Sequence, residues 1–143
     1  MRSPSFLLAA LLTVGCSSVH TASDGGGAPA ARVTGTVTYL QRVALPPTAV
    51  VKVQLVDVSR ADAAATVLGE QTIAAGGKQV PFAFEIPYDP AKVQPNYSYA
   101  VQARIEDGGK LLFINDQRYA VITRGAPTHV DMVLRAVGSA APR

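Results

Sequence analysis

The feature that most constrains this chain is an alternation of apolar and polar residues that recurs along most of its length. Eight runs carry it, at residues 33–39, 51–55, 66–74, 82–86, 99–105, 111–114, 119–122 and 130–134. Successive side chains of a β-strand point to opposite faces of the sheet, so each run offers one face for burial. The pattern therefore predicts seven or eight short strands.

Segments rich in glycine, proline, asparagine or aspartate separate these runs, at residues 46–47, 76–77, 87–95, 107–109, 115–116 and 125–127. Glycine permits positive φ angles and proline cannot donate to a strand ladder, so these segments are expected to be turns and strand ends. Short strands at this spacing are typical of a sandwich or a barrel. We expect an all-β fold, a single antiparallel β-sandwich that follows a signal peptide and a flexible linker.

Three local features refine this expectation. Residues 97–123 predict a three-strand meander, with a first turn at residues 107–109 and a second near Asn115. Asp89 is placed to cap a short helical turn that begins with Pro90. The weak run at residues 66–74 contains a glycine and is our choice for an edge strand, where unpaired backbone groups are available to a partner.

The N-terminal residues have the organisation of an export signal. Arg2 precedes an apolar run at residues 6–12, and the small residue Gly15 precedes Cys16. A charged start, a short apolar centre and a small residue at the cleavage point predict a signal peptide at residues 1–15. The apolar run is far shorter than the roughly 20 residues of a membrane-spanning helix.

Cys16 is the only cysteine of the chain, so it has no disulfide partner and needs another role. Residues 13–16, Thr-Val-Gly-Cys, resemble a bacterial lipobox, which implies that Cys16 is the lipid attachment site. An ordinary signal peptide that happens to contain a cysteine is the alternative. Ser17 is not the aspartate that typically retains enteric lipoproteins at the inner membrane, which implies the outer membrane as destination.

The remaining chain divides simply. Residues 16–31 form the lipidated N-terminus and a linker rich in Ser, Gly and Ala, which is expected to be flexible. Fully extended, its fifteen residues after the cysteine reach roughly 50 Å. Residues 32–137 form one domain of ordinary size, and residues 138–143 form a flexible tail. The formal net charge of +3 is too weak and too evenly spread to indicate nucleic-acid binding.

Four longer segments resemble one known family. Residues 44–62, 76–93, 97–116 and 121–125, in this order, are similar to the YbaY/YscW family of bacterial lipoproteins. The resemblance implies a β-sandwich over about residues 33–134. The secretion-system members are pilotins, which bind a secretin subunit and help it reach or assemble in the outer membrane; other members have no settled role. Most of these segments have the pattern of strands and turns, so they predict the fold better than the partner.

The sequence does not predict an enzyme. An acylated Cys16 leaves no free thiol, and Ser59 and Ser98 do not lie in a Gly-x-Ser-x-Gly elbow. His129 and Asp131 share one strand face, but a zinc site needs three or four ligands. We expect no catalytic residues, no metal site and no cofactor, and we interpret His129 and Asp131 as a solvated strand face.

Two other groups of residues are interpreted structurally. Asp57, Ser59 and Asp62 lack the glycine and distal glutamate of an EF-hand, so hydrogen bonds within a turn explain them better. Phe82 and Phe84 are expected to fill the core.

Three tyrosines offer a further choice. Tyr97, Tyr99 and Tyr119 are placed to line up across the meander, where cross-strand aromatic pairs stabilise a sheet. A binding face is the alternative, because tyrosine is enriched at interfaces. Tyr97 and Tyr99 share a face by parity, and we favour the core for both.

These observations predict a non-catalytic, outer-membrane-anchored domain in the periplasm. The membrane is contacted through the lipid, and the expected partner is an envelope or secretion-system protein segment, such as a secretin-like subunit, held in a groove or at an open strand edge. Two alternatives stay open, a carrier or sensor of a small apolar ligand and a passive structural lipoprotein. A continuous cavity of several hundred Å³ would favour the carrier, and a packed core with an exposed groove would favour the binder.

Overall fold

The computed structural model describes residues 31–138. The predicted signal peptide, Cys16 and nearly all of the linker and tail lie outside the described residues. No helix within residues 31–138 combines the length and the apolar character needed to cross a membrane.

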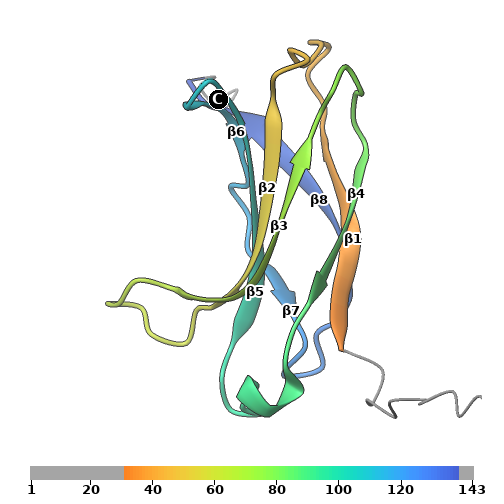
Figure 1. Ribbon diagram of the computed structural model, residues 1–143. Helices are drawn as coiled ribbons and strands as arrows, with labels where there is room; N and C mark the ends of the chain where they lie inside the picture. The colour runs from red at the N-terminus through yellow and green to blue at the C-terminus, as the bar shows by residue number, and fades with distance from the viewer. Residues whose placement is uncertain (1–30, 139–143) are drawn as a thin grey trace, which may run out of the picture.

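The described residues form eight strands and one short 3-10 helix (Figure 1). The strands are β1 (Arg32–Tyr39), β2 (Val50–Asp57), β3 (Thr66–Ala74), β4 (Phe82–Pro87), β5 (Tyr99–Asp107), β6 (Lys110–Ile114), β7 (Tyr119–Val121) and β8 (His129–Ala136), and the helix is η1 (Pro90–Lys92). The predicted all-β class and strand number are confirmed. The helical turn is confirmed as well, because Asp89 caps η1 by accepting a hydrogen bond from the Ala91 amide at 2.9 Å.

The strands pair in the order β3-β2-β5-β6-β8-β1-β4, and β7 pairs with β5. Strands β3, β2 and β5 form one layer and β8, β1 and β4 the other, and the short β6–β8 pairing joins the two layers. The predicted sandwich therefore differs in detail, because its two layers are one continuous sheet that nearly closes into a barrel. Among the described strands, β3 and β4 at the two ends of this order have no ladder between them.

The antiparallel prediction is wrong for one pair of strands. β1 runs antiparallel to β4 but parallel to β8, with Thr34 opposite His129 and Tyr39 opposite Leu134. β8 crosses from the layer of β6 to the layer of β1, and it arrives in the same direction as β1. An alternating pattern records which face of a strand is buried but not the direction of its neighbour, so this pair is not visible in the sequence.

The predicted meander is also wrong. β7 pairs with β5 rather than with β6, so β6 and β7 lie one after the other along the same edge of β5. Between them, the Asn115 amide donates to the Ala103 carbonyl at 3.2 Å, and the Asn115 side-chain oxygen accepts from the Ala103 amide at 2.9 Å. Asn115 thus holds the chain against β5 while residues 115–118 leave the ladder as a small loop.

One continuous cluster of buried apolar side chains fills the space between the layers. Phe82, Phe84 and Ile86 enter it from one face of β4, as their spacing predicted. The ring of Tyr39 stacks on that of Phe113, with centroids 4.1 Å apart. This filled interior favours the binder over the carrier of an apolar ligand.

Candidate binding groove

The outer face of β5 carries a groove. Alternate β5 residues Ala100, Gln102 and Arg104 point away from the core, and Gln54 and Lys52 of β2 lie opposite Gln102 and Arg104. Two hollows of about 160 and 290 Å³ follow this face and share Gln102 and Asn115 as lining residues. We call the two together the β5 groove.

The loop at residues 115–118 builds one wall of the β5 groove. The Asn115 side-chain nitrogen donates to the Gln117 carbonyl at 2.8 Å, and Asp116 forms an ion pair with Arg135 of β8. These contacts fix the loop against the neighbouring strand. Gln117 and Arg118 of the loop line the larger hollow.

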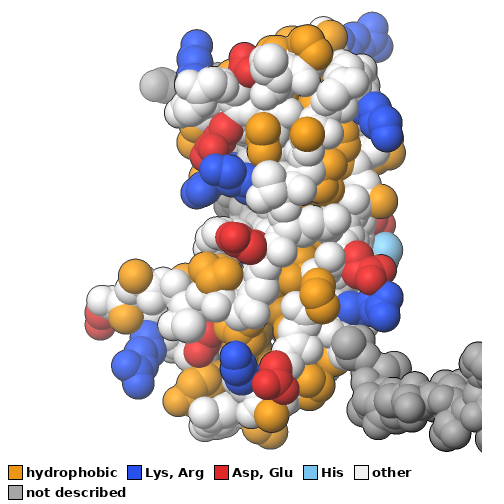
Figure 2. Space-filling model, viewed as in Figure 1, with side chains coloured by type: hydrophobic (Ala, Val, Ile, Leu, Met, Phe, Trp, Pro, Cys, Tyr) orange, Lys and Arg blue, Asp and Glu red, His pale blue; other side chains and the backbone are white. Residues whose placement is uncertain are grey.

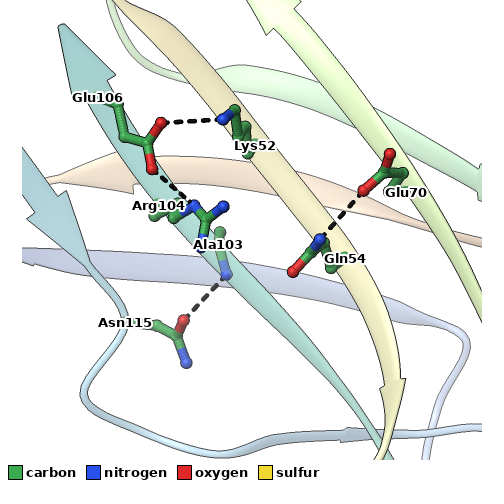
Figure 3. Close-up of polar contacts among 7 residues, drawn as sticks. All are labelled: Lys52, Gln54, Glu70, Ala103, Arg104, Glu106 and Asn115. Atoms are coloured by element: carbon green, nitrogen blue, oxygen red, sulfur yellow. Dashed lines mark hydrogen bonds and ion pairs between the residues drawn. The ribbon is translucent and has the colours of Figure 1, made fainter. Parts of the chain in front are cut away.

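Charged groups lie at the other end of the groove (Figure 3). Glu106 forms ion pairs with the Lys52 ammonium at 2.9 Å and with the Arg104 Nε at 2.8 Å, although the Arg104 contact lacks hydrogen-bond geometry. The hydrogen bond from Lys52 is the largest cause that lowers the pKa of Glu106, and the charges of Lys52 and Arg104 lower it further against the opposing effect of burial. Glu106 is therefore ionised at neutral pH, and two cations share its one carboxylate.

The remaining lining groups are suited to binding rather than to chemistry. Gln54 donates to Glu70 of β3 at 3.0 Å, and the exposed Gln102 beside it offers a side-chain amide. Ile114 lines the smaller hollow and is 41% exposed. The groove thus combines an apolar contact, amides and cations, which are the groups that hold a polypeptide segment.

The edge strand predicted at residues 66–74 is confirmed, because β3 ends the strand order. The Ala75 amide donates to Ala49 on the β2 side at 2.9 Å, and amides alternate between the two edges of a strand, so the Thr72 amide points to the free edge. At the seam with β4, the Glu85 amide donates to the Gln71 side chain at 2.6 Å. A side chain here occupies a place that a neighbouring strand would otherwise fill.

His129 and Asp131 lie on a solvated strand face, as predicted. Their side chains are 62% and 68% exposed and 3.5 Å apart. His129 Nδ1 lies 3.0 Å from the Thr34 hydroxyl, and the Thr36 hydroxyl donates to Asp131 at 2.7 Å. The pair therefore belongs to a polar ladder across β1 and β8. Within the part of the chain that the structure describes, no group of three or more His, Cys, Asp or Glu is placed to hold a metal ion.

The turn interpretation of Asp57 and Ser59 is confirmed. The Ser59 amide and hydroxyl both donate to Asp57, at 2.9 and 2.5 Å, and the Ser98 amide donates to the Ser59 hydroxyl at 2.9 Å. The Ser59 hydroxyl is thus structural, and Asp62 is exposed in the loop that follows.

The three tyrosines differ in burial and in their partners. Tyr99 is buried, and its hydroxyl accepts from the Gln94 amide at 3.0 Å, so the core prediction is confirmed for this residue. Tyr97 is half-buried and packs against the core. Tyr119, also half-buried, accepts from the Val133 amide at 2.9 Å and thereby links β7 to β8. The three tyrosines therefore serve chiefly to hold neighbouring elements of the fold together.

The β5 groove was not predicted from the sequence. It depends on β6 and β7 sharing one edge of β5 and on the loop that this arrangement expels. The only signal was the break in alternation at residues 115–118, Asn-Asp-Gln-Arg, which was interpreted as a reversal of the chain.

Comparisons with known proteins agree with one another. A family model described as type III secretion system lipoprotein chaperone (YscW) matches residues 28–134. The chain is 45% identical over 102 residues to the "Uncharacterized lipoprotein YbaY" of Escherichia coli (strain K12); the match covers 71% of this chain and 53% of YbaY, so the chain spans about half the length of this curated relative. The solved structure of an alternative pilotin from the type II secretion system of Vibrio cholerae aligns with a TM-score of 0.73 and 48% identity, over 76% of this chain and 98% of that chain.

Proposed function

This chain belongs to the YscW family of type III secretion system lipoprotein chaperones, and from this premise we propose that it is a pilotin-like envelope lipoprotein that captures a segment of a secretin-type protein. The family resemblance predicted from the sequence is confirmed by the family match and by YbaY. The partner proposed for this chain is of the kind that a pilotin binds, and the solved relative is a pilotin.

The β5 groove is the observation that carries the proposal. Its walls are held in place by Asn115 and by the Asp116–Arg135 ion pair, so it does not have to be formed on binding. A preformed groove reduces the ordering cost of association. The Arg104 and Lys52 cations beside Ile114 favour a segment that presents acidic and apolar side chains.

Photo-crosslinking in intact cells tests this proposal. A photoreactive residue in place of Gln102, which is exposed on the groove floor, is expected to form an adduct with a secretin-type subunit. The same residue in place of Asp131, exposed on the other layer, is the matched control and is expected to give none. Arg104→Glu should reduce the yield by about tenfold or more, which is roughly 1.4 kcal/mol, because it places a second carboxylate beside Glu106.

Lys92→Glu is the matched charge reversal, since it lies in η1 outside the groove, and it should leave the yield unchanged. Adducts at both positions or at neither would contradict the groove. Full capture by Arg104→Glu together with loss by Thr72→Pro would move the contact to the free edge of β3, because proline removes an amide that faces this edge.

The location of the protein forms a second part of the proposal. We infer that Cys16 carries the lipid, that the domain is held at the outer membrane in the periplasm, and that the linker keeps it near its membrane-bound partner. Cys16→Ala is expected to abolish incorporation of a palmitate analogue and release the protein from the membrane fraction. A wild-type chain that takes up no label would overturn the lipid attachment site and leave the groove to be judged by crosslinking alone.

A further inference from the structure

The end of the domain opposite the start of β1 is built from several chain segments that are fastened together (Figure 1). They are the β1–β2 loop at residues 40–49, the β3–β4 loop at residues 75–81, residues 107–110 at the turn between β5 and β6, and residues 137–138 after β8. The Leu45 amide donates to Gln79 at 2.7 Å, and the Thr48 hydroxyl donates to Asp107 at 2.6 Å. We call these segments together the distal end.

The distal end exposes apolar side chains. Leu40, Val43 and Val137 are 80%, 62% and 51% exposed, more than any other large hydrophobic side chain of the described residues. Figure 2 shows hydrophobic side chains over this end of the molecule, with Lys and Arg side chains at its margins. Single exposed apolar residues are normal on proteins, but three of the most exposed on one end indicate a contact surface.

The same segments are cationic. Arg42, Lys78 and Lys110 are all exposed, and none of them takes part in an ion pair among residues 31–138. The acidic residue of these segments is Asp107, whose carboxylate accepts the hydrogen bond from Thr48. The distal end therefore combines protruding aliphatic side chains with an excess of unpaired positive charge.

The protruding loop is also held in shape. The Tyr39 hydroxyl donates to the Val43 carbonyl at 2.6 Å, and the Tyr39 ring stacks on Phe113 of β6. The Val43 amide donates in turn to the Gln41 carbonyl at 2.9 Å. These contacts fix the loop in a shape that leaves Leu40 and Val43 exposed to solvent. Exposed aliphatic side chains do not contribute to the core, so the stability of the fold does not explain their position.

We propose that the distal end docks onto a phospholipid bilayer with anionic headgroups. Leu40 and Val43 enter the interface between headgroups and acyl chains, and Arg42, Lys78 and Lys110 lie at the level of the phosphates. An anionic bilayer surface complements both features of the distal end, because its headgroups attract the cations and its apolar layer accepts the aliphatic side chains. The nine residues of β5 span about 30 Å, so a linker that reaches roughly 50 Å allows the distal end to contact the membrane that holds the chain.

This proposal goes beyond partner capture and does not use the β5 groove. It is tested with the full chain, purified from membranes and reconstituted in vesicles. Ala44→Cys places an environment-sensitive fluorophore beside Val43 without removing Leu40 or Val43, and Gln102→Cys is the control position. In vesicles that contain phosphatidylglycerol, the probe at position 44 should shift to shorter wavelength and be quenched by a nitroxide lipid, whereas the probe at 102 should report water.

Replacing Arg42, Lys78 and Lys110 with glutamine should lower the docked-to-free ratio by about fivefold for each cation removed. Leu40→Ser with Val43→Ser should abolish the spectral shift and leave the Gln102 probe unchanged. A probe at position 44 that reports water in anionic vesicles would overturn the proposal, as would an equal response in pure phosphatidylcholine. A shift that needs an added protein, or that occurs without vesicles, would make the distal end a protein interface and overturn it equally.

Discussion

Replacing Gly35 with alanine is expected to destabilise the domain severely. Gly35 lies in β1 between β4 and β8, opposite Phe84 and Val130. A Cβ atom at this position would lie 1.8 Å from the Val130 carbonyl oxygen and 2.9 Å from the Phe84 ring. The first contact is with backbone, so the clash is relieved only if two paired strands move apart. We expect a loss above about 4 kcal/mol in the free energy of unfolding, out of the roughly 5–15 kcal/mol that an ordinary domain has.

Circular dichroism at increasing denaturant concentration measures this loss, in the full chain with Cys16 present. Thr36→Ala is the matched control, because it lies two residues further along β1 and loses only the hydrogen bond to Asp131. That bond is exposed, so the control should cost at most about 1.5 kcal/mol. A Gly35→Ala protein within about 1 kcal/mol of wild type would show that β1 and β8 are not packed as described.

Phe84→Ala is expected to cost about 3–5 kcal/mol in the free energy of unfolding. The ring is 3% exposed and belongs to the single core cluster between the layers, so its removal leaves a cavity and forfeits apolar burial. The substitution should lower the denaturant midpoint without changing the slope of the transition.

Glu85→Ala is the neighbouring control on the solvent face of β4. It removes the exposed ion pair with Arg32, which is worth at most about 1 kcal/mol. If Phe84→Ala costs less than about 1 kcal/mol, the assignment of the buried face of β4 is wrong.

Local features of this fold were predictable because their causes are local. The alternation in β4 identifies Phe82, Phe84 and Ile86 as buried whatever strand lies beside them. The cap of η1 depends on Asp89 and the proline that follows it. The glycine at position 69 marked β3 as unusual, and in the structure a Cβ there would lie 2.7 Å from Ile86, so glycine permits the close approach of β3 and β4.

The pairing of strands was not predictable from the same pattern. Whether β7 pairs with β5 or with β6 depends on how Asn115 satisfies the Ala103 backbone, a contact between a loop residue and a strand. The parallel pairing of β1 and β8 likewise depends on the whole path of the chain. The β5 groove follows from the first of these pairings, so it was not visible in the sequence. The candidate site at the free edge of β3 was visible, because it depends on the pattern of one strand alone.

The place of β1 between β4 and β8 has a consequence for the order of assembly. The parallel partner of β1 is the last strand of the domain, and about a hundred residues separate the two in the chain. Contacts between such distant residues form late, because a long loop must close before they are gained. A chain that emerges from a channel with its N-terminus first therefore cannot finish its sheet until β8 has followed. Until then the edge of β1 that pairs with β8 stays open, without its ladder of backbone hydrogen bonds.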